Sequence, residues 1–372
     1  MSTRERTRAV RAAEAPAEAP PPRVLRLPQW TLPRNLSLAA AIGVALWLLS
    51  LAFTPFNDLR LATGAYYFVA LAGLMVLTGL NGQISLGHGA LMAVGAYTAA
   101  LLIGREHWPL VPVLVAATVV AGLVGIAVGA VAARLRGPYL AGATLALAVG
   151  LPSLADRYPG AFGGENGLVV PPPTPPASLG DTFPLERWQS WIACLAALIA
   201  FVLLANLVRG RYGRSFRAVR DDEVAAQLAG LDVARIQVFA FIVSAACAGL
   251  GGGLLVVVTS LAAPGAFTLS LSLALLTGVV LGGLGSLAGA VWGAIVLVLL
   301  PTWTNDVADS LSLSGDVKAN LPLALYGIFL IAVMLAAPGG IQGAVRASTA
   351  WGRRRLNGAQ SAAQGKRAPS EE

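Results

Sequence analysis

Residues 79–102 read GLNGQISLGHGALMAVGAYTAALL, an apolar run interrupted near its start by Asn81, Gln83, Ser85 and His88. A polar group in the hydrocarbon of a bilayer is costly unless it finds a partner, so such groups face the interior of a helix bundle or a water-filled path. The stretch therefore predicts either a transport path or gate, or a structural turn that caps a helix. The residues alone leave both interpretations open.

The composition places this interruption in a membrane protein. Of 372 residues 56% are hydrophobic and only 12% are charged, against about 25% charged in soluble domains. Soluble, disordered and fibrous classes are excluded by this deficit. The net charge of +8 is explained by basic cytoplasmic loops, so we expect a lipid bilayer and no nucleic acid as partner.

Apolar stretches long enough to cross a bilayer recur along the chain. They are 36–53, 61–80, 84–104, 109–132, 139–155, 188–208, 238–258, 269–300 and 321–337. The stretch 269–300 would form a helix of about 48 Å, longer than the hydrocarbon core. Since Gly282-Gly283-Leu284-Gly285-Ser286 interrupts it, we count two passes. The sequence predicts an all-α polytopic membrane protein with about ten transmembrane helices and no charged residue inside a span.

The basic residues predict the orientation. With the N-terminus inside, 21 of the 26 Lys and Arg residues fall on the cytoplasmic side, as the positive-inside rule expects. The prediction is a multi-pass plasma (inner) membrane protein with both termini cytoplasmic. Its parts are a disordered basic segment (1–35), a permease domain (36–337) and a basic cytoplasmic tail (338–372). The longest inner loop is 209–237, and an outer loop covers 156–187.

The inner loop contains a predicted helix. Asp221, Asp222 and Glu223 suit a helix start, the sequence 224–229 favours helix, and Gly230 suits its end. A short capped helix at this place predicts a docking element, with a solvated basic loop at anionic lipid as the alternative. The outer loop, rich in glycine and proline, predicts either an exposed connector or a contact for a solute-delivery partner.

Several kinds of site are absent from the sequence. No G-x-x-x-x-G-K-[ST] loop for phosphate occurs, so the chain is expected to be no enzyme and to carry no nucleotide site of that type. His107 is the only other histidine beside His88, and Cys194 and Cys247 sit in apolar stretches. We therefore expect no metal, no cofactor, no catalytic residue and no disulfide. The spacing GxxxG at 125/129, 249/253 and 285/289/293 indicates packed helices.

The chain also resembles a known family in ordered blocks between residues 60 and 343. The blocks are GLNGQISLGHGALMAVGAYTAALL (79–102), RLRGPYLAGATLALAVG (134–150), GGENGL (163–168), GRSFRAVRDDEVAAQLAGLDVARIQVFAFIVSAACAGLGGGL (213–254), GGLGSLAGAVWGAIVLVLLP (282–301) and YGIFLIAVMLAAPGGIQG (326–343). They are similar to the LivM-like branch of the branched-chain amino acid ABC permeases.

The resemblance implies an ABC importer permease fold and a set of partners. These are a second permease subunit, two cytoplasmic ATP-binding subunits and an extracytoplasmic solute-binding protein. It places the ATPase-coupling loop on Arg214, Arg217, Arg220, Glu223, Ala225, Ala226 and Gly230. Val224 separates Glu223 from the two alanines, which departs from the Glu-Ala-Ala pattern of importers. The class moves amino acids, urea and short amides, so the sequence leaves the solute open.

A stand-alone carrier or channel is the competing interpretation, and a membrane enzyme is a more distant one. A proton-coupled carrier is disfavoured because the predicted spans contain no carboxylate. An importer permease would need separate ATPase chains, whereas a carrier would not.

The predicted topology can be tested by cysteine labelling. Single cysteines at Ser2, Ala177 and Ser361, in a background without Cys194 and Cys247, would be exposed to an impermeant thiol reagent. Only position 177 is expected to react from outside, because the charge distribution puts both termini inside. Reaction of position 361 from outside would contradict the even number of passes.

Overall fold

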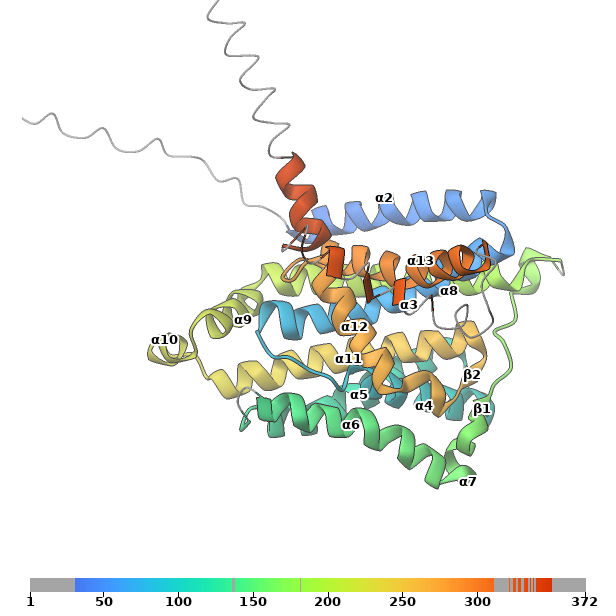
Figure 1. The fold of residues 1–372 in the computed structure, drawn as a ribbon. Coiled ribbons are helices and arrows are strands. Elements are labelled where there is room, and N and C mark those ends of the chain that lie inside the picture. Colours follow the sequence, from blue (N-terminus) through green and yellow to red (C-terminus); the bar gives the residue numbers. More distant parts are fainter. Residues whose placement is uncertain are drawn as a thin grey trace, which may run out of the picture.

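A computed structural model describes residues 31–135, 138–180, 182–310 and part of 321–349. The expectations for residues 1–30, for part of the span predicted at 321–337 and for residues 350–372 lie outside the described residues. The described chain is almost wholly helical (Figure 1).

The elements follow one another in a simple order. They are α2 (Thr31–Ala52), α3 (Pro55–Leu74), the π-helix η1 (Met75–Leu80), α4 (His88–Gly104), α5 (Leu110–Ala132), α6 (Pro138–Arg157), α7 (Pro159–Phe162), η2 (Gly164–Asn166), β1 (Leu168–Val169), η3 (Ala177–Leu179), α8 (Leu185–Arg209), α9 (Arg211–Asp221), α10 (Glu223–Leu228), α11 (Val233–Thr259), β2 (Leu261–Ala262), η4 (Pro264–Phe267), α12 (Leu269–Gly282) and α13 (Leu287–Ser310).

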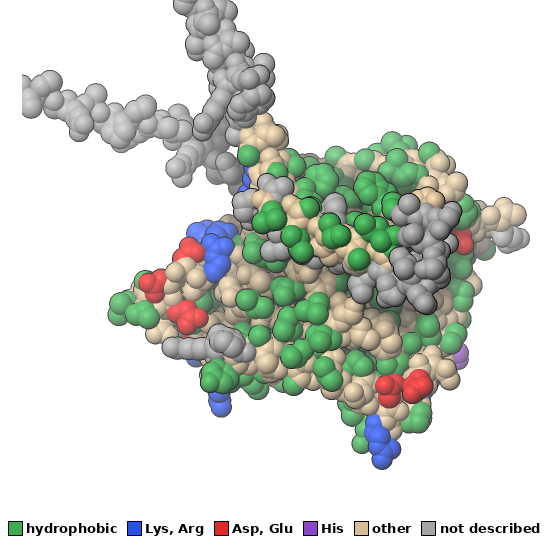
Figure 2. Space-filling model, in the orientation of Figure 1, with side chains coloured by type: hydrophobic (Ala, Val, Ile, Leu, Met, Phe, Trp, Pro, Cys, Tyr) green, Lys and Arg blue, Asp and Glu red, His purple; other side chains and the backbone are tan. Residues whose placement is uncertain are grey.

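Eight helices of the described chain are long and apolar enough to cross a bilayer, and α4 is a shorter apolar helix. Green hydrophobic side chains cover the middle of the visible face, and the charged side chains gather toward its two ends (Figure 2). This is the surface of an integral membrane protein. The prediction of an all-α polytopic membrane protein with about ten spans is confirmed.

Helix α11 lies at the centre of the bundle, packed against α3, α4 and α5. Its glycines allow backbones to touch. A Cβ on Gly252 would overlap Met92 O of α4, and one on Gly249 would overlap Ala121 of α5. On a third side, a Cβ on Gly251 would meet Tyr66 O of α3 at 3.0 Å. Small residues bring helices this close in lipid, where packing holds a bundle together.

The GxxxG pairs predicted from the sequence lie at helix contacts. Gly125 and Gly129 of α5 face Ala245 and Phe241 of α11. Gly289 and Gly293 of α13 face Gly282 and Gly278 of α12, so these two helices run in opposite directions. The break at 283–286 is therefore a tight turn between two passes, which confirms the two-pass interpretation of 269–300. Cys194 and Cys247 are buried, as predicted for residues in apolar stretches.

Two helices begin earlier than the sequence predicted. Helix α2 starts at Thr31, so residues 31–35 belong to it rather than to the N-terminal segment. The side chain of Asn35 explains the extension. Its Nδ2 donates to Asn206 Oδ1 at 2.8 Å, and its Oδ1 accepts from Arg209 Nη1, with both partners on α8. The helix can continue through a polar stretch because these side chains find partners.

Helix α3 starts at Pro55, which brings Asp58 into the span Pro55–Leu80. The expectation that no charge lies inside a span was wrong. Asp58 is fully buried, and its Oδ2 lies 3.3 Å from Arg187 Nε at the start of α8. Proline is well tolerated in the first helical turn, and the contact with Arg187 offsets part of the cost of burying the carboxyl group.

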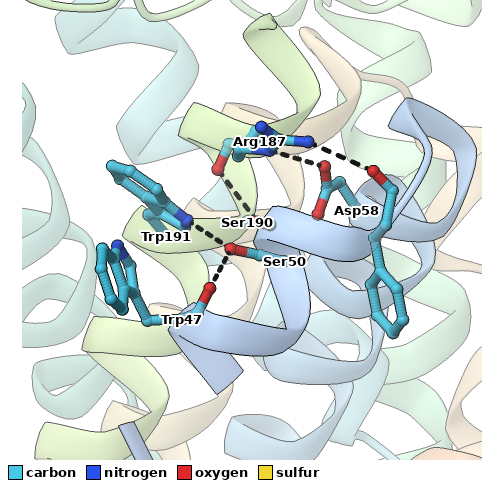
Figure 3. A network of polar contacts seen from close by, with 7 residues as sticks. Trp47, Ser50, Asp58, Arg187, Ser190 and Trp191 are labelled. Carbon is cyan, nitrogen blue, oxygen red and sulfur yellow. Dashed lines mark hydrogen bonds and ion pairs between the residues drawn. The ribbon is translucent and has the colours of Figure 1, made fainter. Parts of the chain in front are cut away.

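Arg187 belongs to a group of polar contacts among the ends of α2, α3 and α8 (Figure 3). Arg187 also donates to Phe53 O at 3.2 Å, and Trp191 Nε1 donates to Ser50 Oγ at 2.9 Å. Helices α2, α3 and α8 are thus joined by polar contacts where the chain turns from α2 into α3.

The bundle has two different ends (Figure 1). Helices α9 and α10 project at one end, which we call the α9–α10 end. At the other, β1 pairs antiparallel with β2, matching Leu168 to Ala262. Gly163, Gly164 and Gly167 have positive φ there, so the glycines of the outer loop form tight turns.

The glycine packing of α11 predicts a stability difference between two matched substitutions. Gly252→Ala places a Cβ against Met92 O, whereas Gly142→Ala on α6 has nothing within 4 Å of its Cβ. Gly252→Ala is expected to lower the free energy of unfolding by about 1–3 kcal/mol. Gly142→Ala should be neutral or slightly stabilising. Melting temperatures of the two variants in detergent measure this, and equal values would contradict the close packing.

Candidate functional site

The polar interruption of residues 79–102 is a break between two helices. The π-helix η1 ends at Leu80, with Asn81 N donating to Val76 O and Gln83 N to Leu77 O. Gly82 follows with φ +77°, a conformation that glycine adopts without strain. π-Helical turns are rare and often mark functional sites.

The chain then runs back into the bundle instead of out into solvent. His88 opens α4, and its Nε2 lies 2.9 Å from Ala70 O on α3. Because Ala70 precedes Leu80 by ten residues, α4 begins about 15 Å inside the bundle. The predicted span 84–104 is therefore shorter than expected, and residues 82–87 are non-helical at membrane depth. Such backbone is tolerated in a membrane only where protein buries it or water lines it.

The four candidate path residues are all buried. Asn81, Gln83, Ser85 and His88 are at most 7% exposed. Asn81 Nδ2 donates to Gln83 Oε1 at 3.0 Å, and Ser85 Oγ accepts from Gly87 N at 3.4 Å. Asn81 Oδ1 and His88 Nδ1 have no partner among the described residues. The structure thus brings the four residues to one buried break.

Two residues with hydroxyl groups belong to this site but were not predicted from the sequence. Thr144 Oγ1 of α6 accepts from Leu86 N at 3.0 Å, and Ser272 Oγ of α12 accepts from Gly89 N at 3.0 Å. Both side chains are buried, and they satisfy one backbone group of the non-helical segment and one of the first turn of α4. A single Ser or Thr in an apolar helix carries no signal of this role, because it more often bonds to its own helix.

The second break lies against the first. A Cβ on Gly79 would stand 2.7 Å from Gly285 N, so the two turns touch through their backbones. The two interruptions of apolar runs, at 81–87 and 283–286, thus meet in the fold. Two C-terminal residues contact the second break and the helix α13 that follows it. Arg346 Nη2 donates to Ser286 Oγ at 2.8 Å, and Trp292 Nε1 donates to Gln342 Oε1 at 3.0 Å.

The inner loop folds into two helices beside these breaks. The predicted helix is α10, capped by Asp222, whose Oδ1 accepts from Val224 N at 2.9 Å and Ala225 N at 3.0 Å. Gly230 follows it with φ +84°. Such caps stabilise a short helix, so the predicted start and end of α10 are both present.

The candidate coupling residues divide by exposure. Ala226 is buried against Val219 and Val233, whereas Ala225 and Gly230 are exposed. Glu223 Oε1 accepts from Gln237 Nε2 at 2.9 Å and so fastens α10 to α11. On α9, Arg214 is exposed, Arg217 is half-buried, and Arg220 reaches the first break.

Residues 58–338 match the family described as the branched-chain amino acid transport system permease component. The chain belongs to this family. The match includes both breaks and the helices α9 and α10, and it confirms the resemblance to branched-chain amino acid ABC permeases.

Curated relatives of this family agree. The high-affinity branched-chain amino acid transport system permease protein LivM of Escherichia coli K12 is 35% identical over 65% of this chain. LivM of Salmonella typhimurium is 34% identical over the same share. The chain spans 62% of the length of these two relatives. LivH of Salmonella typhimurium is 26% identical over 77% of this chain and 94% of its own. No solved structure matches.

Two apolar hollows lie away from the breaks. One of about 310 Å³ lies between α2 and α8, lined by Trp47, Leu61, Trp191 and neighbours. The other, of about 200 Å³, lies between α4 and α6 beside Tyr97 and Phe162. None of the four candidate path residues lines either hollow.

The first break predicts a specific effect of Gln83. Gln83→Leu removes the acceptor of Asn81 Nδ2 and leaves a buried donor without a partner. If these residues form a path or gate, uptake is expected to fall while membrane abundance stays unchanged. Asn81→Leu with Gln83→Leu should then cost no more than the larger single loss, since the two groups bond to each other.

The structural-turn interpretation makes a different prediction for the same variants. Melting temperature would fall, but uptake per inserted molecule would stay normal. Normal uptake for single apolar substitutions of Gln83, Ser85 and His88 would leave only that interpretation.

Proposed function

We propose that this chain is the transmembrane permease subunit of an ABC importer. With a second permease it forms the translocation path for branched-chain or other amino acids, or for related small polar solutes such as urea or amides. Separate cytoplasmic ATPases drive it, and an extracytoplasmic binding protein delivers the solute. Family membership supports the class of protein, and the exposed apolar tip of α10 is the observation that carries the mechanism.

That tip has a composition unusual for a solvent-facing loop. Leu228 is 86% exposed and Val224 is 66% exposed. They stand four residues apart on a helix, which puts them on one face. A pair of apolar residues at the far point of the α9–α10 end suits burial in a protein groove. Because the sequence has no phosphate-binding loop, the work of transport must arrive through such a contact.

The connections of α10 suit it for this task. The helix α9 follows α8 after Gly210, and α11 starts at Val233. Glu223 of α10 accepts a hydrogen bond from Gln237 of α11. Ala226 of α10 packs against Val219 of α9 and Val233 of α11. A push on α10 is therefore carried to α8 and α11 together, the latter being the central helix of the bundle.

The orientation follows from the same assignment. The α9–α10 end, with Arg209 and the arginines of α9, faces the cytoplasm of a plasma-membrane protein. The β1–β2 end then faces outward and holds the outer loop. Its proline-rich stretch 171–176 has no helical or strand assignment and offers a place for the binding protein.

A stand-alone carrier or channel remains the second candidate because of one observation. Asp58 is buried inside a span, and buried carboxylates serve proton-coupled carriers. Its pairing with Arg187, and the absence of a second carboxylate from the described contacts of this pair, weigh against such a role.

The docking role of α10 can be tested at its tip. Leu228→Asp puts a charge where an apolar contact is expected, and the partner ATPase should be lost in co-purification, with solute-stimulated ATP hydrolysis abolished. A buried apolar anchor is worth about 1.5–3 kcal/mol, or roughly tenfold to a hundredfold in affinity. Substitution of Ala226 is less informative, because its side chain is buried in the loop itself.

Leu179→Asp is the matched control for this variant. It makes the same change at an exposed leucine of the outer loop and should leave the ATPase bound. Retention of the ATPase by the Leu228 variant would contradict the docking role. If the unmodified chain brings down no ATPase, the carrier or channel takes first place.

A further inference from the structure

One arginine of the inner loop is partly exposed to solvent and also contacts the first break. Arg220, in the last turn of α9, donates from Nη1 to Gly79 O at 2.8 Å. Its Nε and Nη2 donate to Asp221 Oδ1 at 3.1 and 2.9 Å. An exposed ion pair of this kind adds little stability, but it fixes the plane of the guanidinium group.

The carbonyl that Arg220 meets lacks a helical partner. The last carbonyls of a helix have no donor in their own helix. Val76 O and Leu77 O accept from Asn81 N and Gln83 N, and Gly79 O accepts from Arg220. A positive charge at a helix C-terminus is favourable. Arg220 therefore caps η1 from a helix far away in the sequence.

The same side chain stands next to both breaks. A Cβ on Gly82 would lie 2.8 Å from Arg220 Cγ, and one on Gly285 would lie 3.9 Å from Arg220 Nη1. Gly79 touches Gly285 directly. Gly82 and Gly285 both have positive φ, and the missing Cβ of Gly82 leaves room for the aliphatic stem of Arg220.

We propose that Arg220 is a positioning residue that transmits movement of α9 and α10 to both broken spans. This inference rests on the proposed importer function, in which a partner ATPase moves α10. Asp221 orients the guanidinium group, Gly79 O fastens it to the first break, and the backbone contact of Gly79 with Gly285 carries the movement to the second. The role differs from ATPase contact, because the guanidinium group of Arg220 donates to Gly79 O at the first break.

The test follows the second break directly and needs no knowledge of the solute. Leu284 is half exposed at that break, so Leu284→Cys in a background without Cys194 and Cys247 reports its position by thiol modification. In the complete complex in proteoliposomes, ATP with vanadate should change the rate of modification. In Arg220→Gln this ATP-dependent change is expected to shrink about tenfold or more, as loss of a charge-assisted hydrogen bond predicts, with the ATPase still bound.

Arg211→Gln is the matched control, as it removes the same charge from the same helix at an exposed residue that contacts Tyr212. It should keep the full ATP-dependent change. Arg220→Lys can donate to Gly79 O but cannot hold Asp221 through two nitrogens, so its change should lie between the two. This milder variant replaces Arg220→Gln if the latter does not insert.

Three results would overturn the inference. They are an unaltered ATP-dependent change in the Arg220 variants, loss of the bound ATPase from them, and an unmodified complex in which the second break does not respond to ATP. Loss of the ATPase would make Arg220 a docking residue. Absence of any ATPase with the unmodified chain is a different result, since it contradicts the proposed function itself.

Discussion

The close approach of α11 to three neighbouring helices is the contact on which the rest of the bundle depends. In lipid there is little hydrophobic gain from helix association, so the helices must fit at short distance. Gly249, Gly251 and Gly252 provide that fit toward α5, α3 and α4. Once these three helices are placed around α11, the break between α3 and α4 is enclosed by the bundle.

That enclosure explains the polar chemistry of the break. Non-helical backbone at membrane depth needs partners for its N–H and C=O groups, and the bundle supplies them. The hydroxyl groups of Thr144 and Ser272 accept hydrogen bonds from backbone N–H groups. His88 Nε2 lies at hydrogen-bond distance from Ala70 O, and Arg220 donates to Gly79 O. The same groups that make the break tolerable also connect it to α6, α12 and α9, so the break can respond to movement in several elements.

The two ends of the bundle are built for different purposes. At one end, Arg187 holds Asp58 and the end of α2 in a compact polar cluster, which fixes the relative positions of α2, α3 and α8. At the other, α10 extends apolar side chains into solvent, and Arg220 leads back to the paired breaks. A fixed end and an end able to receive a partner suit a transport subunit that is moved from one side.

The sequence by itself determined the class, the number of spans and the places where they break. Runs of apolar residues and the cap residues Asp222 and Gly230 are local signals, and the elements that they predict are present because the physical cause of each is local. The family resemblance in the blocks around residues 79–102 and 213–254 came from the same source.

Only the tertiary structure decided which residues meet. Residues 79 and 285 come together because α12 and α13 pack against α3, and no local pattern encodes that contact. For the same reason the sequence assigned Asp58 to a loop, treated Arg220 as one of several loop arginines, and did not single out Thr144 or Ser272. Their roles depend on partners more than 50 residues away in the chain, and long-range packing chooses those partners.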